Sequence, residues 1–254
     1  MSHTISIINQ KGGVGKTTTA QALGAGLSLT GKKVLLVDLD PQGNLSKAVG
    51  AATRGKTALE VLKGEAKAQE AIQTTPEAHI IAAGPGLGAD GILTRTGKEY
   101  RLVEALEPVK KKFDFIVIDC PPSLGVLSVN ALTASDFCIV PVQADRFSLE
   151  ALGQFYDTFT AVRKYTNKAL VLMGVLITRY SGRSVLSRDL SDMISDKAQG
   201  MGTRIFNARI REAVAVREAQ MVGKSIFQYA PKSNAASDYM EFVKEVLHYA
   251  KENI

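Results

Sequence analysis

The chain alternates short apolar runs with longer segments in which apolar residues recur every three or four positions. A continuous apolar run of a few residues is typical of a strand buried on both faces, whereas the wider spacing is typical of an amphipathic helix. Strands are predicted over residues 5–8, 34–37, 79–82, 115–118, 137–142, 170–177 and 225–229. Helices are predicted over residues 17–29, 99–111, 128–134, 147–164 and 236–252, with two short helices around Gly64 within residues 45–76.

The order of these elements predicts an α/β fold with a doubly wound, mostly parallel central sheet that helices cover on both faces. A length of 254 residues is compatible with one such unit, because α/β folds reach this size as single domains. Since no repeat, low-complexity tract or linker interrupts the pattern, residues 1–254 are expected to form a single domain.

Composition narrows the class of protein. Hydrophobic residues make up 45% of the chain and charged residues 22%, which is ordinary for a globular protein. No apolar run approaches the ~18 residues that cross a membrane, and no signal peptide precedes the first strand. Cys120 and Cys138 cannot form a metal quartet, and a reduced, cytoplasmic protein is expected. The net charge of +6 is compatible with a polyanionic partner but discriminates little.

A glycine-rich stretch between the first predicted strand and helix carries the most specific motif. It fits Gly-x-x-x-x-Gly-Lys-[Ser/Thr], except that Gln10 or Lys11 stands at the first glycine. The backbone N–H groups of such a loop wrap a phosphate, while Lys16 reaches the β/γ-phosphates and the Thr17 hydroxyl binds Mg²⁺. A glycine-rich turn with stray lysines does not explain the strand–loop–helix context, in which a helix N-terminus faces the phosphate. The expected phosphate-binding residues are Lys11, Gly12, Gly13, Val14, Gly15, Lys16, Thr17 and Thr18.

Lys11 has two interpretations. A lysine at this position cannot easily fold back onto its own phosphate, because Lys16 already occupies that side of the loop. It could instead reach a nucleotide held by a second copy of the chain. The alternative is a solvated surface lysine, since lysines are mostly exposed. The residues alone leave both interpretations open.

Three carboxylates end two of the predicted strands. Asp119 follows residues 115–118 and is placed to hold Mg²⁺ directly or through a water. Its alternative is a helix-capping aspartate before two prolines. Asp38 and Asp40 end the strand at residues 34–37 and share one side if the chain stays extended. One of them can order metal-bound water while the other positions the attacking water, and Pro41 and Gly43 suggest a loop that responds to the γ-phosphate.

Three segments resemble a known family. Residues 9–19, 37–44 and 118–123 together are similar to the ParA/Soj family of DNA-partition ATPases, within the deviant Walker A class that also holds MinD. The resemblance continues through residues 130–136, 141–143 and 223–225 and so covers nearly the whole chain. It implies a P-loop ATPase fold, ATP and Mg²⁺ as cofactors, and slow hydrolysis that a ParB-like partner protein stimulates.

The resemblance also assigns roles to single residues. Lys11 matches the signature lysine that reaches across an ATP-dependent homodimer to the partner's phosphates. Lys16 and Thr17 match the P-loop lysine and the Mg²⁺ ligand, and Asp119 matches the Walker B aspartate. Asp40 matches the aspartate that positions water for hydrolysis. Asp38 is expected near the metal, outside its direct ligands.

An arginine-rich stretch between residues 178 and 224 is where the resemblance places nonspecific binding to double-stranded DNA, and arginines spread over helices and loops suit phosphate contacts without base readout. Arg183 matches a family position linked to DNA binding. The second such position departs from the family, because Ala215 stands there, with Arg211 and Arg217 nearby. The alternative is a solvated surface with acidic partners.

Two features separate the function classes. The phosphate loop begins near residue 10, which leaves no room for an N-terminal helix-turn-helix domain. The helix at residues 236–252 has an apolar side that could lie on a membrane, as in MinD, but its mixed charges favour packing onto the sheet. The leading hypothesis is a cytoplasmic, nucleoid-associated DNA-segregation ATPase without a membrane partner. The alternatives are a MinD-like membrane-surface ATPase and a ParA-like positioner of a protein cargo; the cysteine positions argue against an iron–sulfur carrier.

Overall fold

The computed structural model describes residues 2–89, 96–181 and 185–252. Within them the strands form one seven-stranded sheet in the order β3-β4-β2-β5-β1-β6-β7. All neighbours pair in parallel except β3 and β4, which pair antiparallel. The strands are β1 (His3–Ile7), β2 (Val34–Asp38), β3 (Ile72–Thr74), β4 (His79–Ile81), β5 (Phe115–Asp119), β6 (Phe137–Gln143) and β7 (Val171–Thr178). The predicted doubly wound, mostly parallel α/β fold is confirmed.

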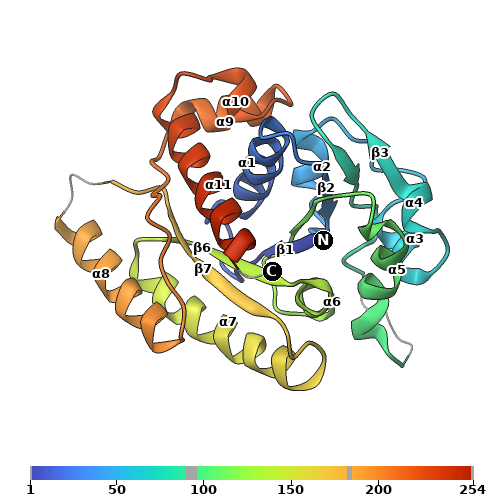
Figure 1. Ribbon diagram of the computed structural model, residues 1–254, viewed down its shortest axis with the longest axis horizontal. Coiled ribbons are helices and arrows are strands. Elements are labelled where there is room, and N and C mark those ends of the chain that lie inside the picture. The colour runs from blue at the N-terminus through green and yellow to red at the C-terminus, as the bar shows by residue number, and fades with distance from the viewer. Residues whose placement is uncertain (1, 90–95, 182–184, 253–254) are drawn as a thin grey trace.

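Helices cover both faces of this sheet (Figure 1). On one face lie α1 (Lys16–Leu29), α9 (Val214–Met221), α10 (Ile226–Tyr229) and α11 (Asn234–Glu252). On the other lie α3 (Ala58–Lys63), α4 (Ala68–Ala71), α5 (Arg101–Lys110), α6 (Val126–Ala134), α7 (Arg146–Tyr165) and α8 (Val185–Gly200). Short α2 (Asn44–Ala48) follows β2, and a 3-10 turn at Lys98–Tyr100 precedes α5. The strands are buried almost throughout, as expected of a sheet covered on both faces.

The C-terminal helix packs against α1, as its mixed charges predict. Tyr239, Phe242 and Val243 of α11 are buried in the core cluster that also contains Leu23 and Leu27 of α1. The close contact depends on a small residue, because a Cβ added at Gly26 would lie 2.5 Å from a Val243 methyl group. Within the described chain no helix is long and apolar enough to cross a bilayer.

The prediction of a last strand at residues 225–229 is wrong, because Ile226–Tyr229 form the short helix α10. The β-branched and aromatic residues favour a strand locally, but the tertiary context overrides that propensity. Phe227 and the buried Ile226 pack in the core cluster beside α1, away from the sheet edge. Ile205 forms an isolated parallel bridge with Val175 of β7, and Arg211 forms one with Tyr180, just after the end of β7.

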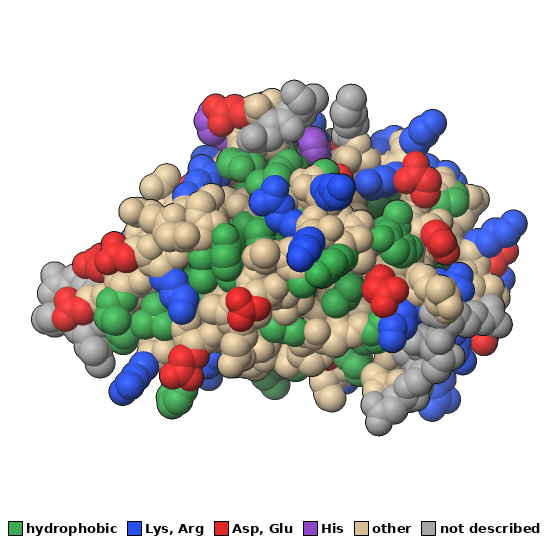
Figure 2. All heavy atoms as spheres, turned by 90° about the horizontal axis from the view of Figure 1, so that it is seen from below, with side chains coloured by type: hydrophobic (Ala, Val, Ile, Leu, Met, Phe, Trp, Pro, Cys, Tyr) green, Lys and Arg blue, Asp and Glu red, His purple; other side chains and the backbone are tan. Residues whose placement is uncertain are grey.

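The surface on the α7 side mixes side chains of all types. Figure 2 shows this face from below, with basic side chains gathered around its upper centre and hydrophobic and acidic ones between them.

Cys120 and Cys138 lie inside the protein, buried and without a disulfide. The parallel topology brings the ends of β1, β2 and β5 to one edge of the sheet, where Asp38 and Asp119 are register partners.

Candidate functional site

The loop between β1 and α1 has the backbone of a phosphate cradle. Gly13 and Gly15 adopt positive φ angles of 75° and 87°, a conformation that favours glycine. Gln143 Nε2 donates a 2.8 Å hydrogen bond to the Gly13 carbonyl, and the Thr178 hydroxyl donates one of the same length to the Val14 carbonyl. The ends of β6 and β7 therefore hold the loop in place while its N–H groups stay available to an anion.

Lys16 and Thr17 begin α1 and point toward the site. The Lys16 ammonium donates a 3.1 Å hydrogen bond to the Lys11 carbonyl across the loop. Only 7% of Lys16 is exposed, and this burial lowers the pKa of its ammonium group. Among the described residues the Lys16 ammonium donates a hydrogen bond to a carbonyl and forms no ion pair, and a buried cation in this state fits a loop built to receive an anion.

Thr17 and Asp119 form the part of the site that fits a cation. The Thr17 hydroxyl donates a 2.7 Å hydrogen bond to Asp119 Oδ2, and Asp119 Oδ1 is buried with no hydrogen-bond partner. Burial, together with the neighbouring Asp38, raises the pKa of Asp119 well above its ordinary value. An orphaned carboxylate oxygen beside a hydroxyl supplies the hard oxygen donors that Mg²⁺ prefers. The residues present therefore fit this metal.

Asp38 is engaged by the loop that follows its own strand. Its Oδ2 accepts hydrogen bonds from the Ser46 N–H at 2.8 Å and the Ser46 hydroxyl at 2.6 Å, and its Oδ1 accepts one from the Asp40 N–H at 3.1 Å. The Ser46 hydroxyl accepts a further bond from the Ala83 N–H. Asp38 thus anchors the segment that carries Asp40 to the edge of β4.

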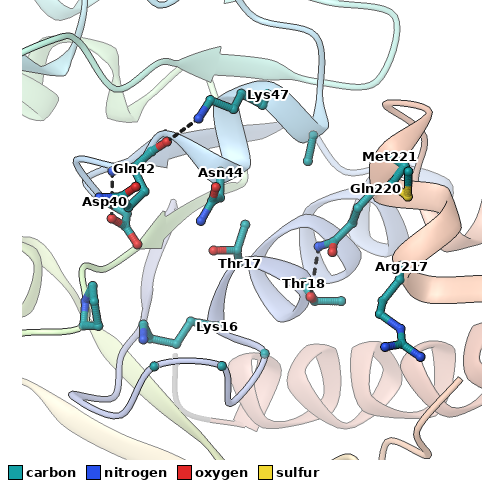
Figure 3. A pocket seen from close by; sticks show the side chains of 15 residues that line it. Lys16, Thr17, Thr18, Asp40, Gln42, Asn44, Lys47, Arg217, Gln220 and Met221 are labelled. Carbon is teal, nitrogen blue, oxygen red and sulfur yellow. Dashed lines mark hydrogen bonds between the residues drawn. The ribbon is translucent and has the colours of Figure 1, made fainter. Parts of the chain in front are cut away.

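Asp40 lines a cavity beside the phosphate loop, which has a volume of about 710 Å³. Its Oδ1 accepts a 3.0 Å hydrogen bond from the Gln42 N–H, which fixes the turn after β2. In Figure 3 Asp40 and Gln42 lie across the cavity from Lys16 and Thr17. The structure therefore brings the predicted phosphate loop and Asp40 together around one space.

Several lining residues were missed by sequence reasoning. Asn44 and Lys47 come from α2, while Arg217, Gln220 and Met221 come from α9, some 200 residues after the loop. Gln220 Nε2 donates a 2.9 Å hydrogen bond to the Thr18 hydroxyl (Figure 3). No local motif marks α9 as part of the site, because its position follows from packing against α1.

Lys11 is held by its own chain. Its ammonium contacts the Asp145 carboxylate at the start of α7 and lies 5.8 Å from the centre of the Phe147 ring. Burial alone would raise the pKa of Asp145, but hydrogen bonds from Lys11 and Ser148 outweigh it and leave the pKa low. The side chains of Lys11 and Asp145 keep 25% and 33% of their surface exposed, so solvent reaches the pair.

The three expected DNA-binding arginines are placed differently. Arg183 lies outside the described residues. The Arg211 guanidinium forms a two-pronged ion pair with the nearly buried Asp238 carboxylate, with N–O distances of 2.9 and 2.5 Å. Arg217 lines the cavity beside the phosphate loop.

The buried carboxylates predict an unusual pH dependence of stability. Burial raises the pKa of Asp38 from 3.8 to about 6, so the folded chain without nucleotide or metal holds a proton that the unfolded chain has lost. The contribution of Asp38 to the free energy of unfolding is fully present below pH ~4. It is lost as the pH rises through ~6, and the loss amounts to roughly 3 kcal/mol. Urea unfolding between pH 4 and 7 should show this fall, and D38N should make it shallower, with the remainder due to the buried Asp119. An unchanged slope in D38N would contradict this assignment.

Comparison with known proteins places the chain in a family. The family described as "AAA domain" matches residues 2–172. The chain is 41% identical to the sporulation initiation inhibitor protein Soj of Bacillus subtilis, over 97% of this chain and 98% of the relative. It is 40% identical to the chromosome partitioning protein ParA of Caulobacter vibrioides, over 96% of this chain and 93% of the relative.

Comparison with solved structures gives the same family of ATPases. A cobyrinic acid a,c-diamide synthase of Mycobacterium smegmatis with bound ADP and magnesium superposes with a TM-score of 0.87 at 36% identity, covering 100% of this chain and 97% of that one. The septum site-determining protein MinD of Pyrococcus horikoshii, complexed with Mg-ADP, gives 0.78 at 28% identity, with coverages of 97% and 96%. With its phosphate loop, its strand-end aspartates and these relatives over almost its full length, the chain belongs to the ParA/Soj family of chromosome-partitioning ATPases.

Proposed function

We propose that this protein binds ATP with Mg²⁺ and hydrolyses it slowly, as the motor of a DNA-segregation system. The observation that carries the proposal is the convergence of Lys16, Thr17 and Asp40 around the 710 Å³ cavity, with the buried Asp119 hydrogen-bonded to Thr17. The relatives crystallised with ADP and magnesium support the choice of cofactors.

The residues divide the work of phosphoryl transfer. The loop N–H groups and Lys16 hold the β- and γ-phosphates, and the buried position of Lys16 strengthens its attraction for them. Thr17 and Asp119 would hold Mg²⁺, and the metal would supply positive charge beside the phosphate oxygens. Asp40, fixed by the Gln42 N–H, orients the attacking water. Asp38 positions the Asp40 segment through Ser46.

Lys11 is proposed to complete the site of a second subunit in an ATP-dependent homodimer. Lys16 already occupies the phosphate side of its own loop, and the carboxylate of its present partner Asp145 keeps a third of its surface exposed, so the pairing can exchange. Charge stabilisation across the interface ties hydrolysis to dimer formation. A ParB-like partner protein is proposed to accelerate hydrolysis in this dimer.

The dimer is proposed to bind double-stranded DNA without sequence preference and so to associate with the nucleoid. The basic segment from residue 179 to residue 217 supplies the contacts, with Arg183, Arg211 and Arg217 as the candidates from sequence. Arg211 can contact a DNA phosphate only if its ion pair with Asp238 is broken or if its guanidinium binds both groups. The relatives at 40–41% identity are a chromosome partitioning protein and Soj, which favours DNA as the cargo.

Two alternative functions can be distinguished from DNA segregation by experiment. MinD is a structural neighbour, but the apolar side of α11 is buried here against α1 and is not available to a membrane surface. The second candidate is a ParA-like positioner of a protein cargo, which the nucleotide site described here serves equally well. A Cyanothece McdA(D38A) structure in complex with ATP also shares this fold, with a TM-score of 0.86 at 27% identity. Vesicle sedimentation with ATP separates the first alternative, because the DNA-segregation function predicts no pelleting.

Nucleotide state should control DNA affinity. A gel-shift titration of a random-sequence duplex is expected to show binding with ATP and about ten-fold weaker binding or none with ADP, because one charged surface per monomer becomes two per dimer. Binding with ATP should weaken steeply between 50 and 200 mM salt, as expected for phosphate contacts. The Lys16→Ala variant serves as the control without a nucleotide response. Equal affinity in ATP and ADP would refute the switch.

The Lys11–Asp145 pair should restrain dimer formation. D145N removes the charge that holds Lys11 and keeps the helix cap on the Ser148 N–H, because asparagine caps as well as aspartate. A solvent-accessible ion pair is worth at most about 1 kcal/mol, so D145N should strengthen ATP-dependent dimerisation by about five-fold or less for each subunit. Analytical ultracentrifugation with ATP measures this, and K11A should abolish the dimer. A dimer that survives K11A would exclude the cross-subunit role.

A further inference from the structure

The helix α9 is attached to the phosphate loop through side chains on one face. Gln220 bonds the Thr18 hydroxyl on the first turn of α1, at 2.9 Å. Arg217 precedes Gln220 by three residues, and positions three apart lie on the same face of a helix. In Figure 3 both side chains come from α9 and lie on the same side of the cavity as Thr18. Arg217 is therefore presented to the nucleotide site by the same helix face that bonds it.

A second, smaller cavity of about 200 Å³ shares this contact with the first. Its lining also includes Thr178, Ile210, Ala213 and Tyr239, which do not line the larger cavity. The residues common to the two cavities are Gly13, Gly15, Thr18, Arg217 and Gln220. Arg217 thus stands at the junction between the space at the phosphate loop and the space behind it.

The charge of Arg217 is free for a ligand. Three arginines line the smaller cavity, and two of them are paired, Arg179 with Glu212 and Arg211 with Asp238. Within the described chain Arg217 has neither an ion pair nor a hydrogen bond, and its side chain is exposed. Its neighbour Glu218 accepts a hydrogen bond from the Tyr229 hydroxyl. A cation at the mouth of two cavities, with no anion of its own, is suited to an anionic ligand.

We propose that Arg217 binds the α-phosphate of the nucleotide, a role that rests on the proposed ATP site. The loop and Lys16 take the β- and γ-phosphates, so a nucleotide extending from the loop brings its α-phosphate to the junction where Arg217 stands. The guanidinium fork matches two phosphate oxygens. This contact takes the place of the DNA contact expected for Arg217 from the sequence. Because ADP and ATP share the α-phosphate, Arg217 holds both nucleotides equally.

Calorimetric titrations of ADP and of the non-hydrolysable analogue AMP-PNP, with Mg²⁺, test this assignment. R217A should raise the Kd of both nucleotides by the same factor, about ten-fold for a lost charge-assisted contact. R217K should recover part of the loss, because a lysine keeps the charge without the fork. The matched control is Lys232→Gln, which removes an exposed charge between α10 and α11 at a residue that lines neither cavity.

The outcomes separate this inference from the proposed function. A wild-type protein that binds neither nucleotide would refute the ATP site itself. Wild-type binding with an unchanged Kd in R217A, or a loss confined to AMP-PNP, would overturn the α-phosphate contact alone. An R217A variant with normal nucleotide affinity and weakened DNA binding would overturn the α-phosphate contact and support the DNA-binding role expected from the sequence.

Discussion

The rest of the site depends on two carboxylates that are buried side by side at the ends of neighbouring strands. Asp38 and Asp119 are register partners on β2 and β5, and neither is exposed. Because buried like charges are costly, each carboxylate needs partners that a bare strand end does not offer. Asp38 finds them in Ser46 and the Asp40 N–H, and so fixes the loop that carries Asp40. Among the described residues Asp119 accepts a hydrogen bond from Thr17 at one oxygen, and its other oxygen is available to a cation.

The phosphate loop is tied to distant parts of the chain rather than standing alone. Its carbonyls are held by Gln143 and Thr178 at the ends of β6 and β7, and Lys11 contacts Asp145 at the start of α7. Thr18 is bonded to α9. Any ligand that draws Lys11 away from Asp145 therefore acts directly on the first turn of α7. This geometry gives a physical route from nucleotide binding to the outer surface of the molecule.

Much of this arrangement follows from local sequence. Continuous apolar runs identified the core strands, and the glycine pattern with Lys16 and Thr17 identified the phosphate loop, because those signals depend on neighbouring residues. The partners that decide each side chain's role are distant in sequence. The anchoring of Asp38 to Ser46 and Ala83, the pairing of Lys11 with Asp145 and the placement of Arg217 all arise from packing. The same holds for Ile226–Tyr229, where burial against α1 overrides strand propensity.

The central claim is that Lys11 completes the site of a second subunit, and mixing two inactive variants tests it most directly. K11A keeps Asp40 but lacks the lysine, whereas D40A keeps the lysine but cannot position water. If Lys11 acts across the interface, a mixed dimer holds one intact site that uses the lysine of the D40A subunit, even though K11A forms no dimer by itself. An equal mixture should therefore regain ATPase activity that neither variant shows alone, reaching about a quarter of the wild-type rate where half of the dimers are mixed. A mixture as inactive as its two components would place Lys11 within its own site and contradict the account.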